Sequence, residues 1–236
     1  LVLEVGVKGM LNVVDACRNE NVRSLVLASS SEVYQTPPKT PTDETAPLIV
    51  PDPTNARYSY GGGKIISELI AINYGRKFFD RVLIFRPHNV YGPDMGWEHV
   101  IPQFARRLKK AAAQLPSGPL PFEIQGDGKQ TRSFCHVDDL VRGVMAMRAK
   151  GAHLGIYHVG TTEEITIADL ARRVAAHAKR EIALKFGPAP AGGTARRCPD
   201  ITKLSKLGYT PQVPLAAGLP PTIDWYWANE SLAPPA

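Results

Sequence analysis

Two short segments of the chain carry residue types that can take a proton from an alcohol. A serine triplet, Ser29 to Ser31, follows an apolar run, and Tyr60 and Lys64 come further along the chain. Residues four apart lie on one face of a helix, so the Lys64 ammonium can sit beside the Tyr60 phenol and stabilise the phenolate. A phenolate held in this way acts as a general base, and a serine hydroxyl on a neighbouring strand can hold the same alcohol. The spacing therefore predicts a site that deprotonates an alcohol.

The residues between Tyr60 and Lys64 are all glycines. Each glycine costs a helix about 1 kcal/mol relative to alanine, so the run favours a place where another segment approaches the helix backbone closely. The alternative is a frayed helix start that carries a surface tyrosine. We expect the close approach.

The periodicity of apolar residues predicts the elements that position these groups. Expected helices cover residues 5–19, 60–73, 99–114 and 138–147, and a further helix ends near Lys179. Expected strands cover residues 24–29, 82–86, 122–125, 132–137 and 156–160, and residues 188–200 are expected to form a loop. Thr166 and Asp169 have the spacing of a capping box for the helix that ends near Lys179. Strand, helix and strand in this order indicate a parallel α/β sheet, whose ligands lie beyond the carboxyl ends of the strands, where the serine triplet stands.

Composition places the chain among ordinary globular proteins, with 44% hydrophobic and 21% charged residues in a length of 236. No apolar run approaches the roughly 18 residues of a membrane span, and the first residues lack the features of a signal peptide. We therefore expect a soluble, cytoplasmic protein with no membrane partner. Three widely spaced cysteines argue against a disulfide framework and a paired-cysteine zinc motif. The first residue is Leu1 rather than methionine, which favours a fragment or a processed chain.

The net charge of +6 leaves open a nucleic acid, an anionic small molecule or a plain solvated surface. The densest basic run lies in the helix expected at residues 99–114 and consists of Arg106, Arg107, Lys109 and Lys110. Apolar residues elsewhere on this helix predict that these charges face solvent on the opposite side and take no part in ligand binding. No nucleic-acid module is recognisable, so we expect no nucleic-acid partner.

Two other groups suggest chemistry that their setting argues against. His136, Asp138 and Asp139 are residue types that bind metals, but a strand end followed by a helix start suits them for the helix terminus, and we expect no metal site. Cys198 lies beside Arg197, which would favour a thiolate. No histidine or other base stands at a recognisable spacing, so we expect a plain thiol.

Several motifs, taken in order, resemble the extended short-chain dehydrogenases/reductases, specifically the NAD-dependent nucleotide-sugar epimerases, dehydratases and decarboxylases. The resemblance covers nearly the whole chain and rests on ASSSEVY (28–34), YGGGK (60–64), RPHNVYGP (86–93), VIPQF (100–104), GDGKQTRSFCHVDDLV (126–141) and RRCPD (196–200). Their common order is far more specific than any single motif.

The resemblance implies an α/β fold with a Rossmann-like, doubly wound parallel sheet, its first part missing, and a smaller C-terminal α/β substrate lobe. Residues 1–92 would form the later part of the NAD-binding domain, with residues 138–160 returning to it. Residues 93–236 would form the lobe that binds the nucleotide sugar. The resemblance also implies NAD as cofactor, a nucleotide-diphosphate sugar as substrate, and a homodimer.

Site residues follow from the same resemblance. The catalytic residues would be Ser30, Tyr60, Lys64 and Glu32. Contacts to NAD would come from Ser29, Tyr60, Lys64 and Pro87. Contacts to the substrate would come from Ser31, Asn89, Gln103, Arg132 and Arg197. Arginine suits the diphosphate because its planar fork can make paired hydrogen bonds to phosphate oxygens.

The chain departs from the family at its start. Members begin with a strand, a glycine-rich turn and a helix that cradle the pyrophosphate of NAD. Gly6 and Gly9 imitate this turn, but Asn12 stands at the third glycine position and no acidic residue ends the next strand, so we reject the fingerprint. The family instead places Gly9 and Asn12 in the helix before the serine strand. We therefore expect the chain as given to bind NAD poorly.

The reaction that follows oxidation is left open by the sequence. We expect Tyr60 to deprotonate a sugar hydroxyl at C4, which gives a 4-keto intermediate, and we place an epimerase first because it is the commonest activity among relatives. Glu32 counts against this choice, since many epimerases lack it and Ser31-Glu32 resembles decarboxylases of the UDP-glucuronate type and GDP-mannose dehydratases. A 4,6-dehydratase stays open too, although those acting on dTDP-sugars usually carry an Asp-Glu pair here. A non-catalytic substrate-binding remnant is the remaining alternative.

Overall fold

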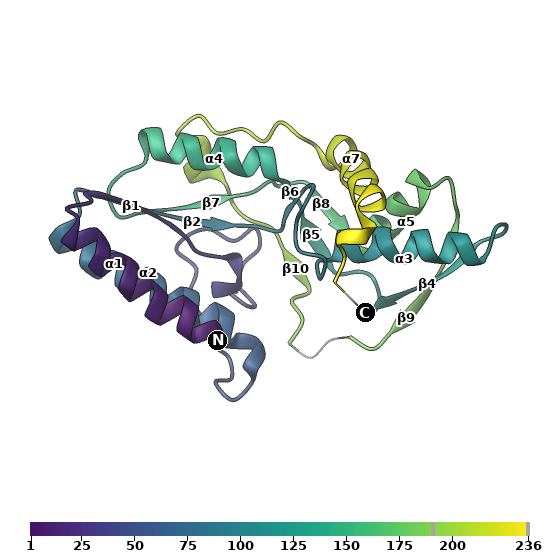
Figure 1. Cartoon of the computed structure of the whole chain (residues 1–236), viewed down its shortest axis with the longest axis horizontal. Helices are drawn as coiled ribbons and strands as arrows, with labels where there is room; N and C mark the ends of the chain where they lie inside the picture. The colour runs from purple at the N-terminus through teal and green to yellow at the C-terminus, as the bar shows by residue number, and fades with distance from the viewer. Residues whose placement is uncertain (190–191, 235–236) are drawn as a thin grey trace.

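The computed structural model describes residues 1–189 and 192–234, and its elements form two parts that lie side by side (Figure 1). The parallel sheet of the first part runs in the order β1 (Ser24–Ala28), β2 (Arg81–Pro87) and β7 (Gly155–Val159). The helices of this part are α1 (Met10–Asn19), α2 (Ser59–Phe78) and α4 (Val137–Lys150). In Figure 1, α1 and α2 lie on one side of the sheet and α4 on the other, which is the doubly wound arrangement that the family resemblance implied.

The parallel register brings the strand ends to a common edge. Ala28 pairs with Phe85, and Pro87 pairs with Val159. The Ser29 N–H donates to the Phe85 carbonyl at 2.8 Å and continues the ladder past β1. The serine triplet therefore lies at the same edge as Pro87, where ligands bind in open α/β sheets.

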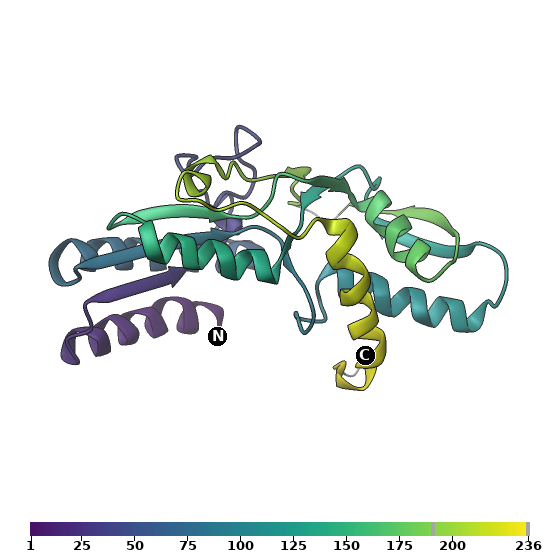
Figure 2. The same cartoon turned by 90° about the horizontal axis from the view of Figure 1, so that it is seen from above.

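The second part consists of short strands covered by helices. β3 (Val90–Tyr91) pairs with β6 (Cys135–His136), β4 (Leu120–Gln125) pairs with β9 (Ile182–Gly187), and β5 (Thr131–Ser133) lies between β10 (Arg196–Arg197) and β8 (Glu164–Thr166). Its helices are α3 (Val100–Gln114), α5 (Ile167–His177) and α7 (Leu215–Ala228). Their apolar faces form one core with β4, which includes Ile101, Leu108, Leu120, Leu170 and Ile223. Viewed from above, α3 and α5 lie at the opposite end of the molecule from α1 (Figure 2).

Four shorter elements connect the longer ones. The 3-10 helices are η2 (Ser31–Val33), η3 (Ala56–Tyr58) and η4 (Glu230–Leu232), and α6 (Thr202–Ser205) is a single helical turn. The η2 turn directly follows the serine strand, so it fixes the direction in which the chain leaves the sheet edge.

The strand expected at residues 132–137 is wrong as a single element. The chain forms β5 and β6 there, separated by Phe134. β5 pairs with β8 and β10, whereas β6 pairs with β3. Because the neighbouring strand changes between β5 and β6, the hydrogen-bonded ladder is interrupted at Phe134. The apolar pattern of one segment does not indicate which strands pair with it, so the sequence could not predict this break.

The sequence also missed four strands, β3, β8, β9 and β10, and β3 is only two residues long. β9 has apolar residues at alternate positions, Ile182, Leu184 and Phe186, which is the signal of a half-buried strand. β8 and β10 are three and two residues long, too short to leave a period. β10 lies inside the segment that was expected to be a loop, so that expectation is wrong at Arg196 and Arg197.

The first segment of the chain is helical. A π-helix, η1 (Glu4–Gly9), leads directly into α1, and Gly6, Gly9 and Asn12 all lie within this helical stretch. The Ser67 hydroxyl of α2 donates to the Gly6 carbonyl at 2.8 Å, so the glycine lies where the two helices meet. The rejection of a glycine-rich phosphate turn at these residues is confirmed.

Three local expectations are also confirmed. Thr166 caps α5, since its hydroxyl accepts from the Asp169 N–H at 3.0 Å and donates to the Asp169 carboxylate at 2.8 Å. His136 caps α4 through its side chain, and the Asp139 carboxylate of the same first turn accepts backbone N–H groups from residues 212 and 213. Cys198 is 1% exposed, and burial raises the pKa of its thiol, as a plain structural thiol requires.

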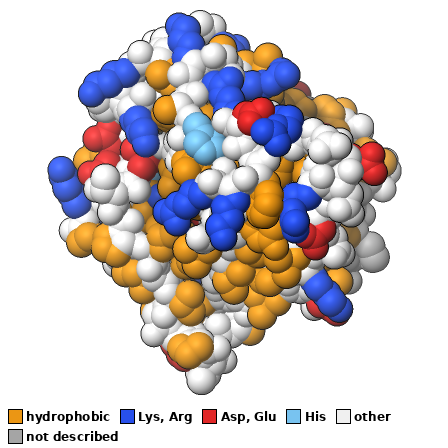
Figure 3. Space-filling view, turned by 90° about the vertical axis from the view of Figure 1, so that its left-hand side faces the viewer, with side chains coloured by type: hydrophobic (Ala, Val, Ile, Leu, Met, Phe, Trp, Pro, Cys, Tyr) orange, Lys and Arg blue, Asp and Glu red, His pale blue; other side chains and the backbone are white. Residues whose placement is uncertain are grey.

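Hydrophobic side chains gather on the face of the molecule that Figure 3 shows. Val13 of α1 and Leu69 of α2 are both exposed, and Val26 of β1 is 38% exposed at an edge of the described sheet. Across the described ranges, none of the helices combines the length and apolar content that crossing a bilayer demands.

Candidate active site

Tyr60 and Lys64 stand at the start of α2 and reach the end of β1. The Lys64 ammonium donates to the Ala28 carbonyl at 2.8 Å and lies 5.7 Å from the centre of the Tyr60 ring. Tyr60 is 47% exposed, so a ligand can reach its hydroxyl. Partial burial lowers the pKa of Lys64, because water no longer fully solvates its charge. The pair therefore sets a cation beside a reachable phenol at the serine-strand end.

Gly61 accounts for the glycines at the start of this helix. A Cβ at this position would lie 2.8 Å from the Glu32 carbonyl oxygen and 2.9 Å from the side-chain nitrogen of Gln35. The other two glycines of the run would make only ordinary contacts. The expected close approach is thus confirmed at Gly61, where α2 packs against η2.

The three serines have different partners. The Ser30 hydroxyl oxygen accepts from the Glu32 N–H at 3.1 Å, which leaves its own hydrogen free to bond a ligand oxygen. The Ser29 hydroxyl donates to the buried Glu68 carboxylate, so a contact from Ser29 to a cofactor would have to use its backbone. Ser31 is 5% exposed within η2. Ser30, at 8% exposed, therefore keeps a hydroxyl hydrogen for a ligand, whereas Ser29 does not.

A buried ion pair joins the elements that carry the site. Arg86 of β2 and Glu68 of α2 are each 2% exposed, and their two hydrogen bonds measure 2.6 and 2.8 Å. Arg86 also donates to the Tyr34 hydroxyl, which lies 2.6 Å from Nε2 of His158 on β7. Burial raises the pKa of Tyr34 to about 12 and lowers that of His158 to about 4, so both are neutral near pH 7. This network, with Ser29 at its end, locks α2, β1, β2 and β7 together.

Glu32 and Arg197 form an ion pair beside the serine-strand end. The distance from Arg197 Nη1 to Glu32 Oε1 is 2.5 Å, and the side chains are 12% and 33% exposed. Arg197 also donates to the Thr194 hydroxyl at 3.2 Å. The Gln35 side chain holds the Glu32 carbonyl at 2.6 Å and so fixes the turn. The structure thus brings Arg197 to Glu32, where a carboxylate already balances its charge.

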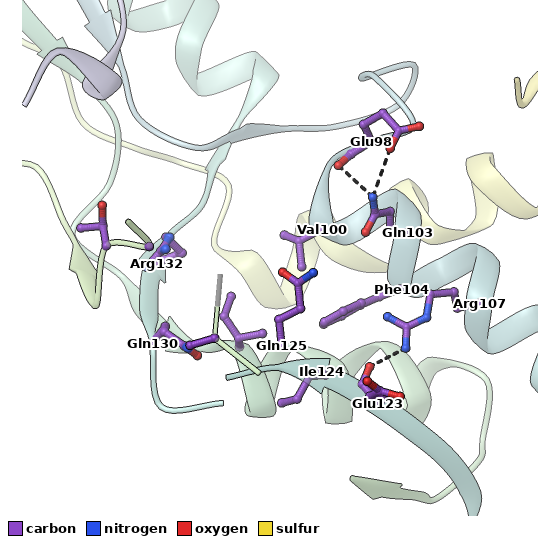
Figure 4. Close-up of a pocket in the computed structure, with 14 residues that line it drawn as sticks. Glu98, Val100, Gln103, Phe104, Arg107, Glu123, Ile124, Gln125, Gln130 and Arg132 are labelled. Carbon is purple, nitrogen blue, oxygen red and sulfur yellow. Dashed lines mark hydrogen bonds between the residues drawn. The ribbon is translucent and has the colours of Figure 1, made fainter. Parts of the chain in front are cut away.

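A cavity of about 580 Å³ opens in the second part, and Thr194, the partner of Arg197, lies in its wall (Figure 4). This volume is typical of small-molecule sites. Its apolar wall includes Val100, Phe104, Ile124 and Ile167. Its polar wall includes Gln103, Arg107, Gln125, Gln130 and Arg132. Flat apolar surface beside a few polar groups suits a planar, polar ligand.

Arg132 is a cation without a carboxylate partner. Its guanidinium donates to the carbonyl of its neighbour Thr131 at 2.7 Å, and in the described part of the chain no carboxylate lies within salt-bridge distance of it. Burial, reinforced by the charge of Arg197, lowers the pKa of Arg132 to about 10. A desolvated guanidinium without a carboxylate partner can bind an anion through paired hydrogen bonds.

The remaining expected substrate residues lie apart from one another. Gln103 lines the cavity with Arg132, and its side-chain nitrogen donates to the Glu98 carbonyl at 3.1 Å. Asn89 has a φ of 38°, and its side chain donates to the Ser133 carbonyl at 3.1 Å, so it braces the loop after β2. Of the expected residues, the structure therefore places Gln103 and Arg132 in one cavity, while Asn89 lies outside its lining.

Arg107 corrects the expectation for the basic run of α3. It lines the cavity, whereas Arg106 lies over the Trp97 ring at 6.0 Å and Lys109 donates to a backbone carbonyl of α7. Arg107 comes three positions after the core residue Phe104 in the sequence. Three steps of about 100° leave its side chain only about 60° around the helix from that of Phe104, and so close to the buried face. The expectation that the basic run faces solvent is otherwise confirmed, because Arg107, Lys109 and Lys110 are exposed. It is wrong only in keeping Arg107 away from the cavity, and angular position on the helix would have separated Arg107 from the others.

Comparisons with known proteins find a matching family model and several similar proteins. The family model described as "NAD dependent epimerase/dehydratase family" matches residues 1–160. UDP-glucuronic acid decarboxylase 4 of Arabidopsis thaliana is 36% identical over 92% of this chain and 47% of that protein. A dTDP-4-dehydro-6-deoxy-D-allose reductase of Streptomyces bikiniensis is 31% identical over 95% of this chain and 67% of that protein. The chain spans about half the length of the plant decarboxylases that it matches.

Solved structures are similar over nearly the whole chain. The dTDP-glucose 4,6-dehydratase DesIV of Streptomyces venezuelae, solved with NAD bound, has a TM-score of 0.83 and 30% identity, covering 98% of this chain and 68% of its own. The UDP-glucose 4-epimerase of Thermus thermophilus, also with NAD, has a TM-score of 0.80 and 27% identity, covering 96% and 71%. The α/β fold expected from the sequence is therefore confirmed, while the division at residues 92 and 93 stays a prediction.

Proposed function

Because the chain belongs to the NAD-dependent epimerase/dehydratase family, we propose that it carries the catalytic and substrate-binding residues of an enzyme that oxidises a nucleotide-diphosphate sugar at C4. The observation that carries this proposal is the Tyr60–Lys64 pair, anchored to the end of β1 by the 2.8 Å bond from Lys64 to Ala28. The unpaired Arg132 in the neighbouring cavity supplies the site for the diphosphate. Together they suit a substrate that spans the two parts.

The strand edge fits the nicotinamide end of NAD. Lys64 uses one of its three N–H donors on Ala28 and keeps two for the hydroxyls of a ribose. Tyr60 is exposed beside it, and Pro87 ends β2 at the same edge. NAD bound there would accept the hydride from C4 of the sugar.

In the proposed first step, Tyr60 removes the proton from the C4 hydroxyl. The Lys64 charge stabilises the phenolate, and the Ser30 hydroxyl donates to the oxygen that becomes the C4 carbonyl. Arg132 holds the diphosphate and thereby fixes the sugar against Tyr60. The resulting 4-keto sugar is the branch point between the possible products.

We propose decarboxylation as the step that follows. A 4-keto uronate is a β-keto acid, which loses carbon dioxide readily because the electrons of the broken C5–C6 bond pass into the ketone and form an enolate. A proton taken up at C5 and the return of the hydride to C4 would then give the pentose. The Glu32–Arg197 pair supports this choice, because Arg197 keeps N–H donors beyond those used on Glu32 and Thr194 and these can orient a sugar carboxylate. The Ser30 hydroxyl can stabilise the enolate oxygen. The similarity to UDP-glucuronic acid decarboxylases supports it as well. Epimerisation, which the sequence placed first, is the second candidate and is supported by the similarity to a UDP-glucose 4-epimerase.

The test is product analysis with the full-length protein, NAD and UDP-glucuronate. Decarboxylation predicts a UDP-pentose, seen by mass spectrometry as the loss of one carbon dioxide, and Glu32→Gln should suppress it. An unchanged mass with inversion at C4 would support the epimerase instead. Binding of nucleotide sugars without any turnover would identify the non-catalytic alternative.

Arg132→Ala is expected to weaken binding of a nucleoside diphosphate by about 10- to 100-fold, the cost of losing a charge-assisted hydrogen bond. Arg132→Lys should recover only part of the affinity, since an ammonium cannot reproduce the planar fork. Arg197→Ala should have the smaller effect, because Glu32 already neutralises Arg197. Isothermal titration calorimetry with UDP measures all three, and equal affinity in Arg132→Ala and wild type would remove the diphosphate site from Arg132.

We also propose that the protein forms a homodimer through α1 and α2. Val13 is 48% exposed on α1, and Ile66 and Leu69 are 40% and 54% exposed one turn apart on α2, so the two neighbouring helices present an apolar surface. Leu69→Glu should shift the protein from dimer to monomer in light scattering after gel filtration. Arg76→Glu, near the end of the same helix, is the control, and a monomeric wild type would contradict the proposal.

A further inference from the structure

Arg107 is a guanidinium in the cavity wall that the proposed reaction does not use. It lies 4.5 Å from the centre of the Phe122 ring and donates through Nη2 to the Glu123 carbonyl. Arg107 is exposed although it lines the cavity, and its Nε and Nη1 groups make no hydrogen bond to the described residues. Arg107 is therefore held flat by an aromatic ring and a carbonyl, with N–H donors left over for a ligand.

Gln103 stands one helical turn before Arg107 on α3, so the two side chains are neighbours on one face. Its side-chain nitrogen donates to the Glu98 carbonyl at 3.1 Å and to the Glu98 carboxylate at 3.4 Å, as Figure 4 shows. Both partners are acceptors, which fixes the orientation of the amide. The amide oxygen of Gln103 is thus left as an acceptor next to the donors of Arg107.

The position of this donor and acceptor identifies the part of a ligand that meets them. Arg132 and Arg107 lie on opposite sides of the cavity in Figure 4, with the apolar side chains of Val100 and Phe104 between them. The following step rests on the proposed function: with the diphosphate at Arg132, the nucleotide base extends towards Arg107. The apolar wall suits the face of a base, and its edge then meets Arg107 and Gln103.

We propose that Arg107, with Gln103, determines base specificity by reading an imide edge, a ring carbonyl next to a ring N–H. The carbonyl accepts from Arg107, and the N–H donates to the Gln103 amide oxygen. Uracil, thymine and guanine share this edge. Cytosine and adenine present an amino group and a ring-nitrogen lone pair in the same places. The amino group would then face the N–H donors of Arg107, and the lone pair would face the amide oxygen of Gln103, so neither hydrogen bond could form.

The test is calorimetric binding of UDP, dTDP, GDP, CDP and ADP to the wild-type protein and to two variants. The wild type should bind at least one of UDP, dTDP and GDP about tenfold or more tightly than CDP and ADP, and whichever of the three binds best identifies the base. Arg107→Gln should reduce that preference to about threefold or less. Arg106→Gln is the matched control, because Arg106 is the adjacent arginine of α3 and lies outside the cavity lining. It should leave the preference unchanged.

Two results would overturn the inference. One is equal affinity of the wild type for imide and amino bases, and the other is a preference that survives Arg107→Gln. If Arg107→Gln unfolds, Arg107→Lys keeps the charge and stem, and the preference should then fall to an intermediate value. Loss of affinity for every diphosphate in Arg132→Ala, with no base preference in the wild type, would contradict this inference alone. Absence of any nucleoside diphosphate binding would instead contradict the proposed function.

Discussion

Replacing Tyr60 with phenylalanine is expected to lower turnover by about 10²- to 10⁴-fold while leaving the affinity for the nucleotide sugar nearly unchanged. The variant removes the one oxygen proposed to take the C4 proton and keeps the ring that packs at the start of α2. Arg132 and the cavity wall, which would provide the binding energy, are untouched. Steady-state kcat in the full-length protein and calorimetric binding of the sugar nucleotide would measure the two effects separately.

Two further variants make this experiment specific. Tyr74→Phe removes a phenol from the same helix, where the ring packs against Phe78 at 5.8 Å, and should leave kcat unchanged. Ser30→Ala should reduce kcat less severely than Tyr60→Phe, since Ser30 holds an oxygen but takes no proton. Retention of more than a few per cent of activity in Tyr60→Phe would exclude Tyr60 as the general base.

The part of the site that the sequence predicted best depends on local spacing. Tyr60 and Lys64 are one helical turn apart, so their proximity follows from the helix alone. The role of Gly61 could also be predicted from the sequence. Glycine destabilises a helix, so its presence at a helix start indicates that another segment packs closely against the helix backbone there. The identity of that contact, the carbonyl of Glu32 in η2, depends on how α2 packs and has no signature in either segment.

The Glu32–Arg197 pair shows where local reasoning ends. The two residues are 165 positions apart, and nothing in the surroundings of either one specifies the other. Resemblance to a family placed Glu32 among the catalytic residues and Arg197 at the phosphates. The ion pair instead makes Arg132 the stronger anion site of the two, because Arg197 has a carboxylate partner and Arg132 has none among the described residues. Which arginine has a carboxylate beside it can be established only from the tertiary structure.

The prediction of the short strands failed for a related reason. The long elements α2, α3 and β2 have enough residues to show a period, whereas β8 and β10 do not. These short strands flank β5 and so carry Arg132 and Arg197 to neighbouring positions, which the parallel pairing of Arg197 with Arg132 makes explicit. The elements with the weakest local signal thus position the residues of the proposed phosphate site.

Glu68→Gln is expected to lower the free energy of unfolding by about 3–5 kcal/mol, although Glu68 lies outside the cavity. The substitution keeps the shape of the side chain and removes its charge. Arg86 would then remain charged, 2% exposed and without its carboxylate, and the Ser29 hydroxyl would lose an ionised acceptor. Urea denaturation followed by circular dichroism measures the change, with the midpoint shifted and the slope preserved.

An exposed ion pair of the same geometry provides the control for burial. Arg23 and Asp80 also form two hydrogen bonds, of 2.6 and 3.1 Å, but their side chains are 61% and 66% exposed. Asp80→Asn should scarcely change stability, because water solvates the arginine that is left behind. The double variant Glu68→Leu with Arg86→Met should be more stable than Glu68→Gln, since it leaves no unpaired charge in the core. If Glu68→Gln is as mild as Asp80→Asn, the network at the strand edge does not depend on its charge, and the proposed bracing of Ser29 and α2 by Glu68 and Arg86 is wrong.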